Sequence, residues 1–179
     1  MTIQFEYEAE QELGFDCASL AKEVAQRVLE MEKCPFEAQV NLIVTTNEEI
    51  KRINTEFRGI AAPTDVLSFP NCEFETPGDF SGLNEDVSNI DLDTQELVLG
   101  DIMISVERVF SQAEEYGHST RREFAFLVAH SLSLIHIFFQ NSGVSGTSEL
   151  LFSVFADKTS ACGVCGNGKF PALSSLFSV

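Results

Sequence analysis

Charged residues almost disappear after residue 130, and this change constrains the fold more than any other feature of the sequence. The 179-residue chain contains 11 Lys or Arg and 28 Asp or Glu, but only four of these follow residue 130. Those four cancel in sign, so the net charge of −17 belongs to the first part of the chain. The last part is rich in Ser, Gly and Phe and has no sustained helical period. We predict one folded domain over residues 1–131 and a separate tail over residues 132–179, disordered or artefactual.

The first part of the chain alternates between the periods of strands and helices. Residues 3–7 alternate apolar with polar side chains, which predicts a half-buried strand. Residues 17–31 repeat apolar side chains at spacings of three and four, which predicts a helix. Alternation around Leu42 predicts a second strand. A T-x-x-E capping box at Thr46 then begins a helix that we expect to end near Phe57.

The middle of the chain is predicted to contain a turn near Pro63, a short strand over residues 66–69 and a long connection. Residues 71–96 hold eight acids, no Lys or Arg, two Gly and one Pro. This composition is typical of a long, solvated loop. Residues 97–105 are apolar and β-branched enough for a buried strand. Gly100 in the middle of that strand predicts a bulge or a close backbone approach.

Two helices are predicted to follow this strand. The first covers about residues 106–116 and ends at Gly117, because glycine readily takes the left-handed conformation found at helix ends. The second begins with another T-x-x-E capping box, at Thr120, and carries His130. One side of this second helix is formed by Phe124, Leu127, Val128 and Ser131.

Composition narrows the functional classes before any motif is considered. There is no apolar run of 18 residues and no secretory signal at the N-terminus, so we expect a cytoplasmic protein without a membrane partner. The five cysteines are odd in number and scattered, which favours reduced thiols over a disulfide framework. The charge of −17 argues against a passive nucleic-acid coat, because such binding depends on Lys and Arg. Any RNA contact must therefore be local.

Three blocks of sequence, in order and spacing, resemble one protein family. They are FRGIAAPTDVLSFP, LGDIMIS and QAEEYGHSTRREFAFLVAH. They are similar to the YbeY family of bacterial single-strand endoribonucleases that mature ribosomal RNA, including the 3′ end of 16S rRNA. The resemblance covers residues 1–131. It implies an α+β fold, with a small mixed β-sheet packed with helices and a zincin-like metal cleft. The implied partners are single-stranded RNA of the rRNA precursor and the small ribosomal subunit, with no DNA.

The resemblance also implies a zinc site, which this chain interrupts. In the family the helix continues as H-G/S-x-L-H-L-x-G-Y-D-H, and its three histidines bind one zinc. Here His130 fills the first position, whereas the second is Leu134 and the third is Gln140, neither of which is a ligand. His136 lies about 240° round the helix from His130 and cannot easily substitute. Because a catalytic zinc normally needs three protein ligands, we expect weak or absent zinc and an inactive chain.

Arg58 matches the arginine that the family is thought to use on the RNA phosphate. A guanidinium suits this role because it stays charged and can hold two phosphate oxygens. The alternative is a surface arginine or an ion-pair partner of Asp65. Asp65 and Asp101 also match family blocks, and we expect them to be scaffold or cleft residues.

The tail and the overall function each leave alternatives open. Residues 132–137 read LSLIHI, which the transposon end used in sequencing libraries encodes in one frame. The tail is therefore interpreted as a chimera or read-through artefact, with genuine truncation by a frameshift as the alternative. The lone C-x-x-C at Cys162 and Cys165 is interpreted as chance. Besides a family nuclease, the chain could be a non-catalytic RNA- or ribosome-associated remnant, or a metallopeptidase-like hydrolase. Metal analysis discriminates the nuclease from the non-catalytic remnant. Assays with RNA and with peptide substrates discriminate the nuclease from the metallopeptidase-like hydrolase.

Overall fold

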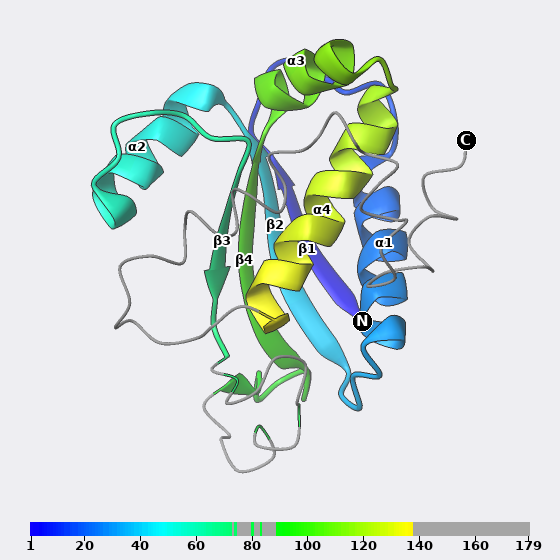
Figure 1. Ribbon diagram of the computed structural model, residues 1–179. Coiled ribbons are helices and arrows are strands. Elements are labelled where there is room, and N and C mark those ends of the chain that lie inside the picture. The colour runs from blue at the N-terminus through cyan, green and yellow to red at the C-terminus, as the bar shows by residue number, and fades with distance from the viewer. Residues whose placement is uncertain (73, 75–79, 81–82, 84–88, 138–179) are drawn as a thin grey trace. The chain divides into compact units, whose positions relative to one another are not determined.

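A four-stranded sheet with helices on both faces forms the core of the protein. The computed structural model describes residues 1–72, 74, 80, 83 and 89–137. The resulting α+β architecture confirms the predicted fold class (Figure 1). Its elements are β1 (Thr2–Tyr7), α1 (Cys17–Met31), β2 (Ala38–Thr45), α2 (Asn47–Arg58), β3 (Val66–Pro70), β4 (Leu97–Ser105), α3 (Val106–Tyr116) and α4 (Thr120–Ile137).

The strands lie in the order β1-β2-β4-β3. The first three are parallel, and β3 runs antiparallel to β4. The register of β4 on β2 shifts by one residue before Val40, and Gly100 follows this shift with φ +145°. A Cβ atom at Gly100 would lie 2.2 Å from the carbonyl oxygen of Phe69 on β3. The predicted bulge and close backbone approach are therefore both present, and glycine is needed there because a side chain would strike β3.

The two faces of the sheet are covered differently. Helices α1 and α4 lie side by side over one face (Figure 1). Strand residues that are fully buried alternate along β2 and β4, as expected for a covered face. On the other face, a smaller cluster joins Ile50 of α2 to Leu67 and Met103. Because α2 stands near the β3 edge, it covers only part of this second face (Figure 1). None of the helices in the described residues is long and apolar enough to cross a membrane.

Helix starts follow the predicted capping rules with one correction. Thr46 caps α2, with its hydroxyl accepting from the Glu49 N–H at 3.3 Å, as predicted. At α4 the prediction of a capping box at Thr120 was wrong. Ser119 is the cap, and its hydroxyl accepts from the backbone N–H three residues on at 3.2 Å. Glu123 lies instead 3.1 Å from His118, so its carboxylate is not available to complete a capping box.

The connection between β3 and β4 corrects a second prediction. We expected a solvated loop, but the described residues in it include four buried apolar side chains: Cys72, Phe74, Phe80 and Leu83. The rings of Phe74 and Phe80 meet edge to face with centroids 5.5 Å apart. Fully burying one such side chain stabilises the fold by roughly 1.5–3 kcal/mol. The acids dominate the average composition of the segment, so composition did not predict that these side chains are buried.

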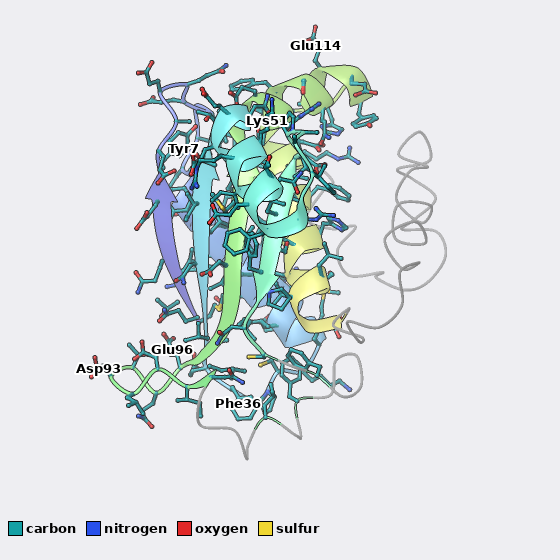
Figure 2. The ribbon with its side chains drawn as sticks, turned by 90° about the vertical axis from the view of Figure 1, so that its left-hand side faces the viewer. Tyr7, Phe36, Lys51, Asp93, Glu96 and Glu114 are labelled. Carbon is teal, nitrogen blue, oxygen red and sulfur yellow. The ribbon has the colours of Figure 1, made fainter. Side chains whose placement is uncertain are left out.

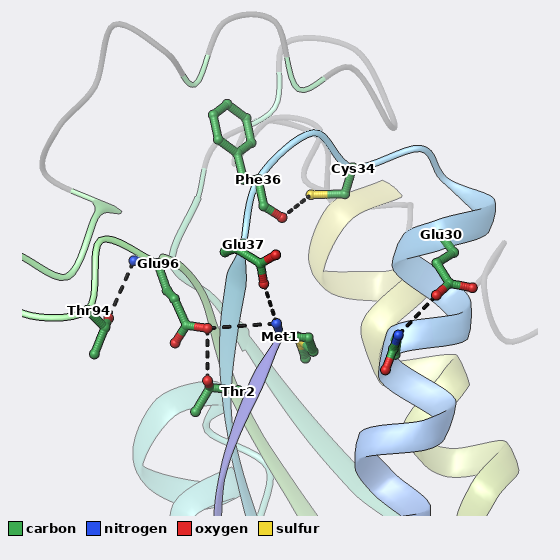
Figure 3. A network of polar contacts seen from close by, with 9 residues as sticks. Met1, Thr2, Glu30, Cys34, Phe36, Glu37, Thr94 and Glu96 are labelled. Carbon is green, nitrogen blue, oxygen red and sulfur yellow. Dashed lines mark hydrogen bonds and ion pairs between the residues drawn. The ribbon is translucent and has the colours of Figure 1, made fainter.

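A polar network joins the starts of three strands (Figure 3). The Met1 ammonium lies against the carboxylates of Glu37 and Glu96. The Thr2 hydroxyl also donates to Glu96, at 2.8 Å. Glu96 is buried, so these partners supply the compensation that a carboxylate needs away from water. The ammonium also holds the pKa of Glu37 below its usual value, chiefly through their hydrogen bond. The network ties β1 to its neighbours.

Candidate functional site

His130 lies in the second half of α4 and is half-buried. One turn earlier on the same helix is Phe126. The two rings are stacked, with centroids 6.0 Å apart and planes 2° from parallel. The residues on either side of His130, Ala129 and Ser131, are buried. Packing of these neighbours therefore holds the helix in place around His130, independently of any contact made by the His130 side chain.

The position one turn beyond His130 is held by an aliphatic side chain. Leu134 is half-buried, and its neighbours Leu132 and Ile135 are fully buried. The helix continues to Ile137, through the position where the family pattern has the glycine of a turn. Within the described residues, no three His, Cys, Asp or Glu side chains gather to hold a metal ion. These residues do not fit a three-ligand zinc site. Gln140 and the side chain of His136 lie outside the described residues.

Arg58 is the last residue of α2 and is exposed to solvent. Within the part of the chain that the structure describes, its guanidinium makes no hydrogen bond and no ion pair. The alternative of an ion pair with Asp65 is therefore not what the structure shows. The Asp65 carboxylate accepts instead from the Thr64 hydroxyl at 3.0 Å and the Gln112 amide at 3.1 Å. Arg58 can present all of its donors to an external anion.

The end of α2 is held rigidly even though its side chains are exposed. Gly59 takes the left-handed conformation at φ +68° and donates to the Thr55 carbonyl. Asn54 is buried, and its side-chain amide donates to the Ala62 carbonyl at 2.8 Å. The Ile60 N–H returns to the Asn54 carbonyl at 3.3 Å. These bonds fix the loop after α2, so Arg58 has a defined position on the surface.

A polar cluster that sequence reasoning missed lies where α3, α4 and the start of β3 converge. Gln112 reaches Asp65 at 3.1 Å, and His118 lies 3.1 Å from Glu123. The ring of Tyr116 lies over that of His118, with centroids 6.1 Å apart. Burial, and then the negative charges of nearby carboxylates, raise the pKa of Tyr116. Four of these residues lie within the third family block. The block was used only to recognise the family, so the contacts among these side chains were not predicted. The cluster fixes the α3–α4 turn.

Asp101 and the two principal site residues are placed apart. Asp101 is exposed on the same face as α2, and it accepts from the Asn41 amide at 2.6 Å. Arg58 belongs to α2, whereas His130 belongs to α4 on the opposite face of the sheet. No hydrogen bond or ion pair joins Arg58 to His130 in the described residues.

Comparison with known proteins identifies the family. The fold is that of an α+β protein with a helix-borne histidine and a surface arginine. The family described as Endoribonuclease YbeY matches residues 3–138. The Endoribonuclease YbeY of Lachnoclostridium phytofermentans is 51% identical over 133 residues, covering 74% of this chain and 81% of its own length. That of Agathobacter rectalis is 51% identical over 139 residues, covering 77% and 83%. The chain belongs to the YbeY endoribonuclease family.

Two further similarities were found. The Endoribonuclease YbeY of Lachnospira eligens is 45% identical over 143 residues, covering 77% of this chain and 83% of its own length. The solution structure of a Thermotoga maritima protein has 23% identity and a TM-score of 0.45, covering 89% of this chain and 93% of that one.

Proposed function

We propose that this chain is an RNA-binding member of a zinc-dependent, single-strand-specific endoribonuclease family that binds RNA through Arg58 but does not cleave it. The relatives it matches are named endoribonucleases, which favours RNA over the peptide substrates of a metallopeptidase-like hydrolase. The observation that carries the proposal is Leu134, an aliphatic side chain one turn beyond His130. We place the family's activity, by resemblance, in rRNA processing in the cytoplasm, on precursors of the small ribosomal subunit.

RNA binding is supported by the state of Arg58. Its guanidinium is exposed and has no partner among the described residues. Contacts from Arg to phosphate position a nucleic acid without reading its sequence. The chain is strongly acidic, so a single arginine held on a rigid helix end provides local attraction that the net charge does not. Binding should accordingly weaken as salt rises, with a shallow slope because few phosphates are neutralised.

Loss of cleavage is supported by the ligand count. A catalytic zinc site normally combines three protein ligands with one open position. In the described part of α4, His130 is the one residue at a family ligand position that can bind zinc. A single imidazole holds zinc weakly, so the family's chemistry has no metal to use here.

The test measures zinc and RNA cleavage together on the purified, tag-free chain. We expect well below one zinc per chain by elemental analysis and no cleavage of a labelled single-stranded RNA. The Leu134→His variant adds a second imidazole on the His130 face, yet should stay inactive, because the third ligand is still missing. Leu134→Gln is the matched control, since it adds a polar group of similar size that is a poor zinc ligand. Stoichiometric zinc in the unaltered chain, with cleavage abolished by a chelator and by Arg58→Ala, would disprove the proposal.

RNA binding is tested separately from cleavage. Arg58→Ala should weaken the binding of a short single-stranded RNA in a fluorescence anisotropy titration at low salt. Arg52→Ala is the matched control, because Arg52 lies on the same helix but is tied to Glu49 and Glu56. Equal affinities for Arg58→Ala and the unaltered chain would remove the proposed role of Arg58.

A further inference from the structure

Phe57, immediately before Arg58, is an unusual aromatic side chain for this molecule. Large hydrophobic residues that are exposed number three among the described residues, and Phe57 is the one aromatic, with 65% of its surface exposed. Ile60, at 45%, lies three residues further along the same helix end. The third, Leu92, lies in the connection between β3 and β4. Exposed apolar surface is therefore concentrated beside Arg58.

The helix period explains why Phe57 is exposed. Ile50, Ile53 and Phe57 recur at spacings of three and four, so they share one side of α2. Ile50 is fully buried, Ile53 is half-buried and Phe57 is mostly exposed. The apolar side of α2 thus begins on the sheet and ends beyond it. The ring of Phe57 meets that of Phe69 on β3 edge to face, with ring centroids 5.3 Å apart.

That contact leaves a ring held in place but still open to solvent. Edge-to-face packing uses one part of the aromatic surface and restrains the ring. The hydrogen bonds of Asn54 and Gly59 restrain the backbone just after it. A ring fixed before its ligand arrives loses little conformational entropy on binding. Phe57 is therefore suited to receive a flat partner.

The charges around Phe57 indicate what that partner is. Arg52 is tied to Glu49 and Glu56, at 2.6 and 3.0 Å. Lys51 and Arg58 have no ion-pair partner in the described residues, and they are seven positions apart, so they lie on one line along α2. Figure 2 shows Lys51 on the side of α2 that faces the viewer. Within the described residues, an exposed aromatic ring next to an unpaired guanidinium, with a second unpaired cation two turns earlier on the helix, complements a strand of phosphates and bases.

We infer that Phe57 is a base-stacking residue, which receives an unpaired base of single-stranded RNA while Arg58 holds an adjoining phosphate. The inference rests on the proposed RNA-binding function and extends it by naming a residue that recognises the base. Proteins that bind single strands combine a cationic track with aromatic side chains on which bases stack. Because every base has a π face, this contact favours single strands over duplexes without selecting a sequence.

The experiment separates stacking from phosphate binding. A labelled oligo(rA) and a strand of the same length with abasic ribose phosphates are titrated into the full chain at fixed low salt. Phe57→Ala should weaken oligo(rA) binding roughly 5- to 100-fold and leave the abasic strand unchanged. Phe57→Trp should restore binding, whereas Phe57→Leu should not, because leucine keeps apolar area but has no π face. Leu92→Ala is the control for loss of an exposed apolar side chain elsewhere.

The outcomes distinguish this inference from the function on which it rests. If Arg58→Ala weakens both strands while Phe57→Ala weakens neither, RNA binding stands and the stacking role is overturned. If Phe57→Leu binds oligo(rA) as well as the unaltered chain, apolar contact with the RNA is sufficient and the π face is not used, which also overturns the stacking role. If the unaltered chain binds neither strand, both ideas fail. Thermal melts of all variants confirm that each is folded, as expected for changes at exposed positions.

Discussion

The second half of α4 and the C-terminal end of α2 differ in how strongly packing against the rest of the domain restricts which side chains can stand there. In α4, Leu132 and Ile135 are fully buried and continue the apolar side that Phe124 begins. The helix stays intact through Leu134, the position of the family's second metal ligand. At the end of α2, Phe57 and Arg58 are exposed and make few contacts, yet the backbone there is fixed by hydrogen bonds.

This difference shows that the fold and the metal site have separate requirements. Packing of α4 requires apolar side chains at a helical period, and Leu132, Leu134 and Ile135 satisfy it without a second histidine. Arg58 and most of Phe57 are exposed, so packing places few demands on these two residues. A folded domain of this family is therefore no proof of an intact catalytic centre.

The largest effect expected from this comparison is on stability. Phe124→Ala removes a fully buried ring of α4 and should lower the free energy of unfolding by about 3–5 kcal/mol. The same change at Phe57 loses mainly the edge-to-face contact with Phe69 and should cost about 1 kcal/mol. Urea unfolding followed by circular dichroism measures both. Equal costs would show that the two regions do not differ as described.

The second prediction concerns the anchor of α2. Asn54→Ala removes the amide that donates to the Ala62 carbonyl and should cost about 1–2 kcal/mol. Hydrogen exchange should rise locally at Gly59 and Ile60, whose N–H groups are bonded within this turn. Lys51→Ala is the control, because that side chain is exposed and makes no ion pair in the described residues. Unchanged exchange at Gly59 would mean that the loop is held by something other than Asn54.

A third, smaller effect depends on pH and concerns the α4 side of the sheet. Asp16 caps α1, and hydrogen bonds from the Ser19 N–H and hydroxyl hold the pKa of its carboxyl below its usual value. Because the pKa of Asp16 is lower in the folded than in the unfolded state, its ionised carboxylate stabilises the fold fully at any pH above the unfolded-state pKa. This stabilisation is lost as the pH falls through the folded-state pKa. Asp16→Asn keeps an acceptor but removes the titration. The variant should lose less stability than the unaltered chain between pH 5 and 2, measured by thermal melts across that range.

The smallest expected effect is on the alkylation of Cys17, which should not occur in the folded protein. Cys17 lies at the start of α1 and is buried, and burial raises the pKa of its thiol to about 11. Since the thiolate is the reactive form, iodoacetamide at pH 8 should leave Cys17 unmodified in the folded protein. Site-resolved mass spectrometry gives the extent of labelling at each cysteine, and urea should expose the thiol. Rapid labelling of native Cys17 would show that the layer between α1 and the sheet opens easily.

Local sequence patterns predicted the regular elements well. The bounds expected for α1 and α3 match those observed, because a helical period and a glycine at the C-terminus are local signals. The burial of Phe74 and Phe80 was not predicted, since it depends on side chains that meet only after folding. The cap of α4 was misplaced by one residue because His118 competes for Glu123.

The candidate site was less predictable than the fold. Arg58 and His130 were selected because they match family motifs. That they lie on opposite faces of the sheet could be known only from the strand order and helix placement. Phe57 shares one side of α2 with Ile50 and Ile53, which are buried or half-buried. It is exposed because α2 extends past the β3 edge, and no local pattern encodes where a helix leaves its sheet.

The strand order has a consequence for synthesis of the chain. β3 pairs with β4 alone in the described sheet, and β4 fits between β2 and β3 although it is made last. At about 5–20 residues per second, β3 must wait on the order of seconds after leaving the ribosome before its partner emerges. During that interval both β2 and β3 have an unpaired edge that another nascent chain could occupy. Crowded expression should therefore produce aggregates through these strands, and slower translation upstream of residue 97 should increase them.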